Sequence, residues 1–481
     1  MPDAPAPVLD VSNLKVTTHS TALMEGLSFD ITRGERVGLI GESGSGKSLT
    51  ALSIIGLLPS ALKASGSVSF HGRELLELPD KQMRKFRGTK IGMIFQEPMS
   101  ALDPLMKISK QIPASSSTTT RLLEEVGLDS SFATRYPHQL SGGQRQRVMI
   151  AMALALDPEL LICDEPTTAL DATTQADILT LIEKLVETRG LSLLFITHDL
   201  DVVRRMCTET MVLRDGEIVE AGATADILNA PQHAYTRQLI AASQLGKSIP
   251  DDSPLTEIDV NIAEVSKLYG NNAAVDKVSL QITRGSRWGL VGGSGSGKTT
   301  LIKMIAGLIR PSAGEVDVNG SVQMVFQDPQ GSLNPRMTIF NIIAEGLPDK
   351  TDVAAKVDAV LKSVGLLPEH AARYPHEFSG GQRQRISIAR AIIGNPEILL
   401  ADEAVSALDV SVRSQILELL SKLVDELDLT LIFISHDLAV VRQLCTHVAV
   451  MKDGKIVEQG LTEEIWGSPE HDYTQKLLSV V

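Results

Sequence analysis

The chain has 481 residues, 43% of them hydrophobic and 22% charged, and its formal net charge is -14. This length and composition argue against a disordered protein and predict two or three domains, each large enough for its own core. The acidic balance, without any long run of lysine and arginine, disfavours nucleic acid as a partner.

The first residues, MPDAPAPVLD, lack the basic and apolar regions of a secretory signal, and no unbroken run of about 18 apolar residues occurs. We therefore expect a soluble, cytoplasmic chain. Cys163, Cys207 and Cys445 are too few and too scattered for a disulfide framework or a zinc site. We expect all three to be small buried hydrophobic residues.

The sequence contains a long internal repeat. GESGSGKS at 41–48 returns as GGSGSGKT at 292–299, and LSGGQRQR at 140–147 returns as FSGGQRQR at 378–385. A repeat of this length indicates a duplicated domain rather than a solenoid. We expect a first domain over residues 1–245, a polar linker over 246–256 and a second domain over 257–481.

Short apolar runs such as RVGLIG and LSLLFITH alternate with longer segments of helical spacing such as QADILTLIEKLVETRG. This alternation predicts an α/β fold with a mainly parallel sheet in each domain.

The first motif in each half matches the pattern G-x-x-x-x-G-K-[S/T], directly after an apolar strand and before a helical segment. Such glycines let successive backbone N–H groups face phosphate oxygens, and the lysine reaches the β and γ phosphates. A flexible Gly/Ser turn is the alternative, but two matches in the same context argue against it. The expected ATP-binding residues are Gly41, Ser43, Gly44, Gly46, Lys47, Ser48 and Leu49 in the first loop, and Gly292, Ser294, Gly295, Gly297, Lys298, Thr299 and Thr300 in the second.

An Asp-Glu pair closes an apolar run in both halves, in ELLICDEP and EILLADEA. Asp164 and Asp402 are expected to hold Mg²⁺ together with Ser48 and Thr299. Glu165 and Glu403 are expected to polarise an attacking water. Surface acids held in ion pairs are the alternative, but the position at a strand end in both halves disfavours it.

Two further residue types are ambiguous alone and gain meaning from the repeat. His198 and His436 follow β-rich runs, where an imidazole could contact the γ-phosphate, although a single histidine is more often structural. Gln96 and Gln327 lie between the phosphate loop and the SGGQ motif of their halves.

These motifs occur in the same order in both halves and resemble those of the ATP-binding cassette (ABC) ATPases, and the resemblance covers nearly the whole chain. It implies in each half a core sheet, a β subdomain and a helical subdomain. It also implies that the two cassettes pair head to tail within the chain, so that the signature of one closes over the ATP held by the other. Ser379, Gly380 and Gly381 would then complete the first site, and Ser141, Gly142 and Gly143 the second. Gln96 and Gln327 would act in catalysis and at Mg²⁺.

The tails around Pro231–Thr236 and Pro469–Thr474, both Pro-x-His-x-Tyr-Thr, look like those of the oligopeptide, dipeptide and nickel importer ATPases in a fused form. This resemblance implies two membrane permease subunits as partners, an extracytoplasmic solute-binding protein as an indirect partner, and a place at the cytoplasmic face of the inner membrane. The tail could also be a helix cap with packing aromatic residues. The rival function is a cytosolic twin-cassette ATPase that acts on a nucleoprotein complex in translation or repair.

Four departures from the family pattern carry expectations of their own. Tyr269 is placed to stack on adenine in the second half, but the matching first-half position is Thr18, which predicts weaker stacking there. Ala404 stands where the first half has Pro166, which predicts a looser turn after Glu403. Because no cysteine follows Tyr235 or Tyr473 within the tails, we expect no iron-sulphur cluster.

The fourth departure is the stretch 107–127, which looks short and low in complexity where relatives have a permease-gripping helical subdomain. A coupling helix of the permease would enter the neighbouring groove, with Ala101, Leu102 and Leu105 as candidate contacts.

Overall fold

A computed structural model describes residues 6–167, 170–243, 257–349, 351–405, 408, 410–435 and 437–478. The chain divides into two compact units, one made of Met1–Leu170 and Thr174–Ser243 and the other of Asp171–Thr173 and Gln244–Val481. The expected linker, 246–256, lies outside the described residues, so the domain limits stay a prediction. No described helix has the length and apolar character needed to cross a membrane.

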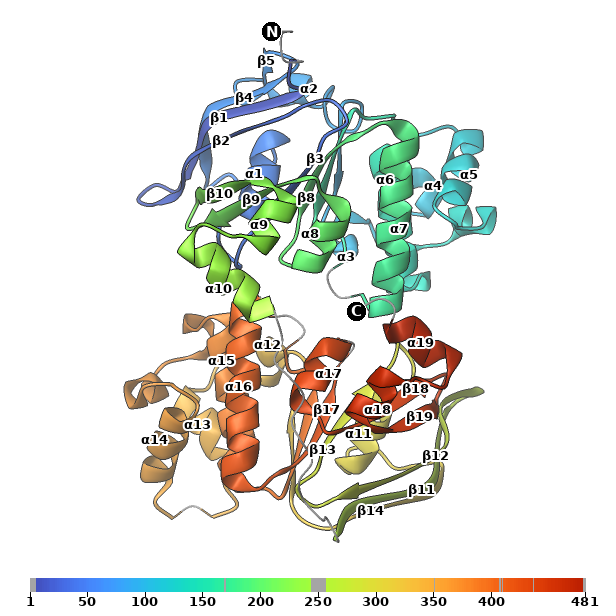
Figure 1. The fold of residues 1–481 in the computed structure, drawn as a ribbon, viewed down its shortest axis with the longest axis vertical. Coiled ribbons are helices and arrows are strands. Elements are labelled where there is room, and N and C mark those ends of the chain that lie inside the picture. Colours follow the sequence, from blue (N-terminus) through green and yellow to red (C-terminus); the bar gives the residue numbers. More distant parts are fainter. Residues whose placement is uncertain are drawn as a thin grey trace. The chain divides into compact units, whose positions relative to one another are not determined.

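The first unit alternates strands and helices along the chain, as the sequence predicts (Figure 1). Its elements are β1 (Leu9–Thr17), β2 (Ala22–Ile31), β3 (Arg36–Ile40), α1 (Lys47–Ile54), β4 (Lys63–Phe70), β5 (Arg73–Glu74), α2 (Asp80–Met83), β6 (Ile91–Ile94), α3 (Pro98–Ala101), α4 (Ile108–Gln111), α5 (Ser116–Glu125), α6 (Gly142–Leu154), β7 (Leu160–Asp164), α7 (Ala172–Arg189), β8 (Ser192–Ile196), α8 (Leu200–Met206), β9 (Glu209–Arg214), β10 (Glu217–Ala223), α9 (Thr224–Asn229) and α10 (Ala234–Ser243).

The second unit repeats this order with shorter connections upstream of its signature motif. Its elements are β11 (Ile258–Tyr269), β12 (Asn272–Thr283), β13 (Arg287–Val291), α11 (Lys298–Ile305), β14 (Ala313–Val318), β15 (Val322–Val325), α12 (Pro329–Ser332), α13 (Ile339–Ala344), α14 (Val353–Ser363), α15 (Gly380–Ile392), β16 (Ile398–Asp402), α16 (Val410–Leu427), β17 (Thr430–Ile434), α17 (Leu438–Leu444), β18 (His447–Lys452), β19 (Lys455–Leu461), α18 (Thr462–Gly467) and α19 (Asp472–Leu478).

Each unit has a six-stranded core sheet, in the orders β10-β9-β3-β8-β7-β6 and β15-β16-β17-β13-β18-β19. All neighbouring strands are parallel except the edge strands β10 and β19, which run antiparallel. A separate antiparallel sheet, β2-β1-β4-β5 or β12-β11-β14, forms the β subdomain. The predicted α/β class, with a mainly parallel core sheet, is confirmed.

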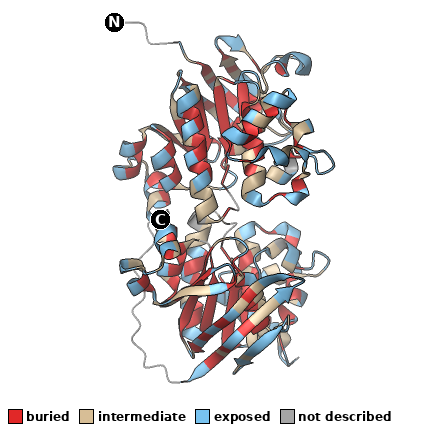
Figure 2. Cartoon of the chain, turned by 90° about the vertical axis from the view of Figure 1, so that its right-hand side faces the viewer, coloured by how far each residue is buried: buried red, intermediate tan, exposed pale blue. Residues whose placement is uncertain are grey.

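The central strands are buried on both faces, which is why they read as continuous apolar runs rather than as alternating ones. Along β7, Leu161 and Cys163 join one core cluster, whereas Leu160 and Ile162 join the cluster on the other side. Figure 2 shows the same pattern as buried strands beneath helices whose outer faces are exposed. Burial of each such aliphatic side chain contributes about 1.5–3 kcal/mol.

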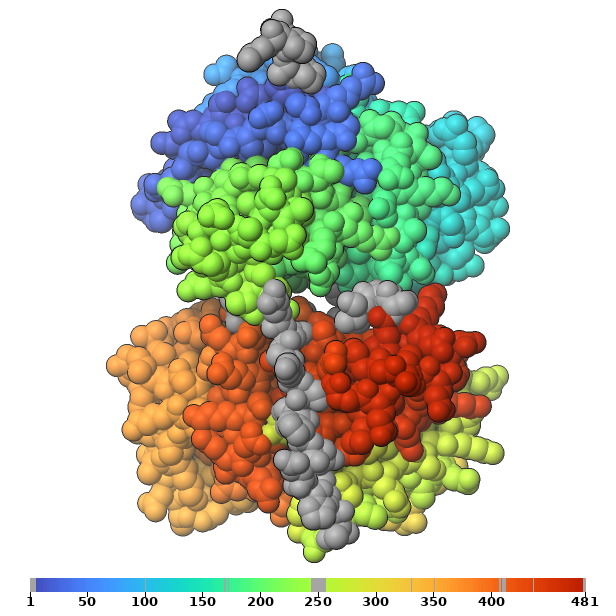
Figure 3. Space-filling view, viewed as in Figure 1, coloured from blue at the N-terminus to red at the C-terminus, as the bar shows by residue number. Residues whose placement is uncertain are grey.

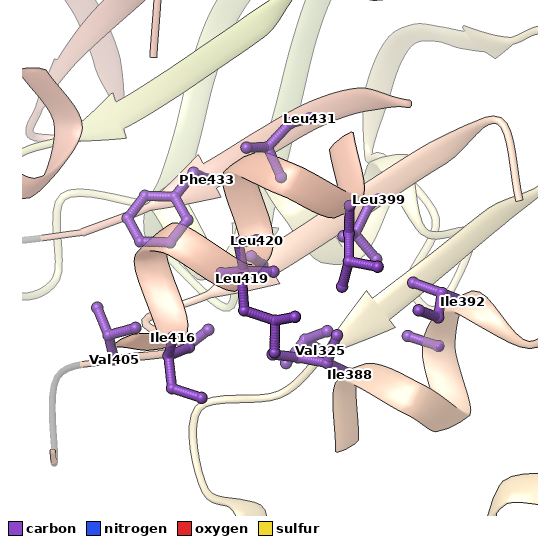
Figure 4. Close-up of a cluster of buried hydrophobic side chains, with 14 of the residues drawn as sticks. Val325, Ile388, Ile392, Leu399, Val405, Ile416, Leu419, Leu420, Leu431 and Phe433 are labelled. Carbon is purple, nitrogen blue, oxygen red and sulfur yellow. The ribbon is translucent and has the colours of Figure 1, made fainter. Parts of the chain in front are cut away.

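In the second unit the core around α16 shows how helix and sheet pack together. Leu399, Leu431 and Phe433 of the sheet lie with Ile416 and Leu420 of α16 (Figure 4), and all five are fully or almost fully buried. α15 adds Ile388 and Ile392 to the same cluster. The helical spacing of these residues therefore places one face of each helix against the sheet.

Stretch 107–127 does fold, although it is short. It forms α4 and α5, and Ser115 caps α5 by accepting a hydrogen bond from the backbone N–H of Thr118 at 3.4 Å. Leu122 and Leu123 of α5 are buried in the core, so the helix is anchored despite its polar surface. The second unit carries the corresponding layer as α13 and α14.

The strands that carry the predicted site residues all end at one edge of the core sheet. Ile196 at the end of β8 pairs with Asp164 of β7 on one side and with Leu39 of β3 on the other. Residues that follow these strands therefore meet at the carboxyl edge, where ligands bind in open parallel sheets.

Candidate active site

Each predicted phosphate loop joins the end of a buried strand to the start of a helix. β3 ends at Ile40 and α1 begins at Lys47, while β13 ends at Val291 and α11 begins at Lys298. The N-cap residues Gly46 and Gly297 have φ values of 105° and 104°, in the left-handed region. A glycine is therefore required where the loop turns into the helix whose N-terminus would face phosphate.

The other loop residues differ in how much space they have. A Cβ on Gly41 would lie 2.2 Å from the carbonyl oxygen of Leu213, and one on Gly292 would lie 2.1 Å from that of Met451. The loops thus pack directly on the ends of β9 and β18. By contrast, Gly44 and Gly295 have nothing within 4 Å of a Cβ position. Ser43 and Ser294 are exposed, and Leu49 and Thr300 lie partly buried in the first helical turn.

The two loop lysines are buried and point back into their own loops. Lys47 Nζ donates to the carbonyl oxygens of Gly41 at 2.7 Å and Glu42 at 2.8 Å. Lys298 Nζ donates to those of Gly292 at 2.8 Å and Gly293 at 2.9 Å. Burial lowers the pKa of Lys298 against the opposing effect of Glu403 and Asp402. These ammonium groups are thus held at the position where phosphate would replace the loop carbonyls.

A buried aspartate at the end of a core strand faces the hydroxyl that follows each lysine. Ser48 Oγ donates to Asp164 Oδ1 at 3.1 Å, and Thr299 Oγ1 donates to Asp402 Oδ1 at 3.5 Å. Burial, together with the neighbouring Glu165 charge, raises the pKa of Asp164 to about 6, against the lowering effects of the Ser48 hydrogen bond and the Lys47 charge. Burial likewise raises the pKa of Asp402. A carboxylate that is costly to ionise in isolation needs a cation nearby.

This donor set fits Mg²⁺. Among the described residues, no three His, Cys, Asp or Glu side chains converge as a self-sufficient metal site. One carboxylate and one hydroxyl per unit suit an ion that keeps several waters and takes further oxygens from nucleotide phosphates. Asp164 with Ser48, and Asp402 with Thr299, are therefore the residues that would hold it.

The glutamate after each of these aspartates has an unusual backbone. Glu165 and Glu403 have φ values of 46° and 45°, a conformation that few non-glycine residues adopt. Their backbone N–H groups donate to the carbonyl oxygens of Ile196 at 2.9 Å and Ile434 at 3.1 Å, which anchors each turn on the neighbouring strand. Such strained residues cluster at functional sites.

The glutamines predicted to act in catalysis and at Mg²⁺ contact the two glutamates. Gln96 Nε2 donates to Glu165 Oε2 at 3.1 Å, and Gln327 Nε2 donates to Glu403 Oε2 at 2.7 Å. His198 Nδ1 lies 3.3 Å from Glu165 Oε1, so three predicted residues of the first unit meet at one carboxylate. His436 lies outside the described residues, and its role stays a prediction.

The signature motifs begin helices α6 and α15. Ser141 Oγ accepts from the backbone N–H of Gln144 at 3.3 Å, and Gln144 Oε1 accepts from the N–H of Ser141 at 3.0 Å. Ser379 and Gln382 repeat both bonds at 3.3 and 3.0 Å. This capping box explains the glutamine of SGGQ, and it leaves Ser141, Gly142, Ser379 and Gly380 exposed at a helix N-terminus.

The second glycine of each signature has a packing role that sequence reasoning missed. A Cβ on Gly143 would lie 2.5 Å from Thr174 Cγ2 of α7, and one on Gly381 would lie 2.4 Å from Val412 Cγ1 of α16. These glycines therefore let two helices approach closely, in addition to offering backbone N–H groups.

The two positions at which adenine stacking was considered differ in structure, and the stacking itself stays a prediction. Tyr269 ends β11 with 54% of its surface exposed, and Lys267 Nζ lies 5.5 Å from its ring centroid. Thr18 instead follows β1 in a turn, where its Oγ1 accepts from the N–H of Thr21 at 2.9 Å. No ring is available at that first-unit position.

A groove next to the second phosphate loop has a volume of about 1010 Å³. Its lining includes Thr299, Gln327 and Asp402, and it also includes Phe326, Glu345 and Arg390.

In the first unit, one predicted permease contact is wrong: Leu102 is buried in the core at 2% exposure, because α3 packs against α6. Ala101 is partly buried, whereas Leu105 is 85% exposed and remains available.

Sequence reasoning also missed the tail tyrosines as part of the loop structure. Tyr235 and Tyr473 accept hydrogen bonds from the backbone of the phosphate loops of their own units. Their position in matching Pro-x-His-x-Tyr-Thr tails was the only available signal.

Comparison with known proteins adds independent support for the family resemblance. The chain matches the family described as "ABC transporter" over residues 24–168 and 275–406, and the one described as "Oligopeptide/dipeptide transporter, C-terminal region" over residues 219–263. It is 43% identical to the peptidoglycan transport ATP-binding protein YejF of Agrobacterium fabrum (strain C58), over 98% of this chain and 96% of that protein. It is 41% identical to the glutathione import ATP-binding protein GsiA of Escherichia coli (strain K12), over 98% of this chain and 89% of that protein.

Among solved structures, the archaeal ribosome recycling factor aABCE1, in complex with the stalk protein aP1, aligns with a TM-score of 0.64 over 92% of this chain and 88% of that chain. RNase-L Inhibitor aligns with a TM-score of 0.65 over 94% and 91%. Both are 22% identical to this chain, so the likeness shows a shared fold of two cassettes and nothing about function.

Proposed function

The chain belongs to the ABC transporter family of ATP-binding proteins, and from that premise we propose that it is the ATP-hydrolysing motor of an importer for peptides or a related small solute. ATP-binding proteins of this family hydrolyse ATP to ADP and phosphate to power import, and this chain is such an ATPase. The observation that supports the cargo class is similarity over nearly the full length to two proteins named for peptidoglycan transport and glutathione import. Both names denote peptide-containing solutes. The matched oligopeptide/dipeptide C-terminal region supports the same class.

The site residues of each unit have separate roles in ATP binding and hydrolysis. Lys47 and Lys298 exchange their loop carbonyls for the β and γ phosphates, and Asp164 with Ser48, or Asp402 with Thr299, would hold Mg²⁺. When bound, this ion neutralises charge on the phosphates. Glu165 and Glu403 accept a proton from the attacking water, and Gln96, Gln327 and His198 orient these carboxylates.

We propose further that each site is completed by the signature of the other half. The exposed N-termini of α6 and α15 offer a serine hydroxyl and backbone N–H groups to an anion, and neither contains an acid or base for chemistry. Pairing within one chain is favoured, because a linker holds the two halves at an effective concentration on the order of millimolar.

Cysteine cross-linking tests this pairing. The variant Ser43→Cys with Ser379→Cys should be cross-linked by a short bifunctional maleimide in MgATP and much less in its absence. The matched control, Ser43→Cys with Ser141→Cys, places both thiols in the same half and should not cross-link within the chain. Equal cross-linking of the two variants would refute the head-to-tail arrangement.

The remaining partners follow from the importer assignment. We propose two permease subunits that dock at the cytoplasmic face of the inner membrane and a solute-binding protein on the other side. In the second unit, the groove beside Gln327 is the proposed receptor for a permease helix, since it adjoins the glutamine that contacts Glu403. Movement of that helix would shift Gln327, and the hydrogen bond from Gln327 to Glu403 would pass this shift to the Glu403 carboxylate.

Reconstitution tests the function as a whole. The chain is purified with its permeases in lipid vesicles, and ATP hydrolysis is measured with the solute-binding protein and a panel of short peptides, including glutathione and peptidoglycan peptides. Stimulation by a peptide together with peptide uptake supports the proposal. Co-purification of the chain with ribosomes or DNA instead of permeases would overturn it in favour of the nucleoprotein alternative.

A further inference from the structure

The C-terminal stretch of each unit reaches back to the phosphate loop. Tyr235 Oη accepts a hydrogen bond from the backbone N–H of Glu42 at 3.1 Å, and Tyr473 Oη accepts one from Gly293 at 2.7 Å. Glu42 and Gly293 are the second residues of the two loops, and the partners lie 193 and 180 positions apart in sequence. Figure 3 shows the tail segments, coloured green before residue 243 and red near the end of the chain, at the surface of their units.

A rigid turn holds each tyrosine in place. In the first unit the carboxylate of Glu220 accepts from the backbone N–H groups of Gln232 at 2.7 Å and His233 at 3.0 Å. His233 Nδ1 in turn accepts from the N–H of Tyr235 at 3.2 Å. The histidine thus caps the helix that carries the tyrosine.

The second unit repeats the turn bond for bond. Glu458 accepts from the N–H groups of Glu470 at 2.8 Å and His471 at 3.2 Å, and His471 Nδ1 accepts from that of Tyr473 at 3.0 Å. Both units thus hold the tyrosine with the same four-residue arrangement, made of Glu220, Gln232, His233 and Tyr235 in the first and Glu458, Glu470, His471 and Tyr473 in the second.

A cation lies over the face of each tyrosine ring. Arg214 Cζ lies 4.9 Å from the ring centroid of Tyr235, and Lys452 Nζ lies 5.1 Å from that of Tyr473. Each cation ends its strand, β9 or β18, directly after the residue whose carbonyl oxygen lies against the first loop glycine. The end of the strand and the tyrosine therefore lie close together, and both contact the phosphate loop.

We propose that Tyr235 and Tyr473 are positioning residues that fix the phosphate-binding loops for ATP. In the first loop, the N–H of Glu42 is held by the tyrosine and its carbonyl by Lys47. In the second loop, Tyr473 and Lys298 hold the same two groups of Gly293. When the lysine moves to phosphate, the tyrosine bond is the anchor that stays.

The inference rests on ATP binding by these loops and does not need transport. Its test uses the full chain and measures one site at a time: Tyr235→Phe in a Lys298→Ala background, and Tyr473→Phe in a Lys47→Ala background. Phenylalanine keeps the ring and its cation contact and removes only the acceptor oxygen. We expect the Kd of a fluorescent ATP analogue with Mg²⁺ to rise about 2- to 10-fold, the range of one hydrogen bond. In the otherwise unaltered chain, the double Phe variant should show a raised KM for ATP, with kcat within about twofold of the parent.

The matched controls are Tyr136→Phe and Tyr374→Phe, which remove a tyrosine hydroxyl from the same units outside these loops and should leave the Kd unchanged. A merely structural role would lower the melting temperature of the Phe variants without changing the Kd of the folded protein, and that result would overturn the proposal. Unchanged Kd and unchanged melting temperature would overturn it equally. If neither background bound nucleotide at all, the assignment of the loops themselves would fail, which distinguishes the two conclusions.

Discussion

Gln327 Nε2 donates to Glu403 Oε2 at 2.7 Å, and this bond joins the proposed permease groove to the residue that would activate water. Gln96 and Glu165 make the same contact at 3.1 Å. In each unit the carboxylate is thus held by a side chain from the segment between sheet and helical subdomain. A glutamine that moves with the permease would change the direction of the carboxylate.

Replacing both glutamates tests their role directly. The double variant Glu165→Gln with Glu403→Gln keeps size and polarity but cannot accept a proton, so we expect ATPase kcat to fall about 10²- to 10⁴-fold. ATP affinity should be retained, because the lysines and loops are intact. Steady-state phosphate release and equilibrium ATP binding measure the two quantities, and turnover at the wild-type rate would contradict the assigned role.

The two nucleotide sites should differ in affinity, because Tyr269 offers the second site an exposed ring for the base, whereas Thr18 stands at the matching position of the first unit. Tyr269→Thr, measured in a Lys47→Ala background, should weaken ATP binding at the second site by about 5- to 150-fold, the range of one base-aromatic stack. Tyr269→Phe is the matched control, since it keeps the ring and should bind nearly as well as the parent. A Thr variant that binds ATP as tightly as the Phe variant would show that the exposed ring does not meet the base.

The close contact of α6 with α7 predicts a specific rescue. Gly143→Ala places a methyl group 2.5 Å from Thr174 Cγ2 and should lower the free energy of unfolding by about 1–3 kcal/mol. Thr174→Ser removes that Cγ2 methyl, so the double variant should recover most of the loss. Gly142→Ala is the steric control, because the nearest atom lies 3.5 Å away. Thermal melting of the ligand-free protein measures the stability of all four variants: Gly143→Ala, Thr174→Ser, the double variant and Gly142→Ala. Equal losses of stability in the two single alanine variants would refute the packing argument.

The three cysteines should be unreactive in the folded protein. Cys163, Cys207 and Cys445 are buried and unpaired, as predicted, and burial raises the pKa of Cys207 to about 12 and that of the other two also. A raised pKa lowers the thiolate fraction at pH 8, and the thiolate is the reactive form. A chromogenic disulfide reagent at pH 8 should therefore label no thiol before unfolding and all three in denaturant. Rapid labelling of the native chain would contradict the buried placement.

Much of the site follows from local order along the chain. The phosphate loops and the Asp-Glu pairs could be predicted because strand, loop and helix succeed one another directly, and parallel strands bring their carboxyl ends to one edge. The role of Gln96 came instead from the resemblance to a known family. Leu102 could not be placed correctly, because its burial depends on how α3 packs against α6. Gly143 looked like a backbone donor only, since nothing in the motif shows that Thr174 lies against it.

The sequence by itself determined the duplicated α/β architecture and the family chemistry, because these depend on periodicity and on contiguous motifs. The tertiary structure alone decided which tail residue meets which loop amide and which glycine a helix needs for packing. Such contacts join residues as far as 193 positions apart, and their geometry comes from the packing of the whole unit rather than from any local preference.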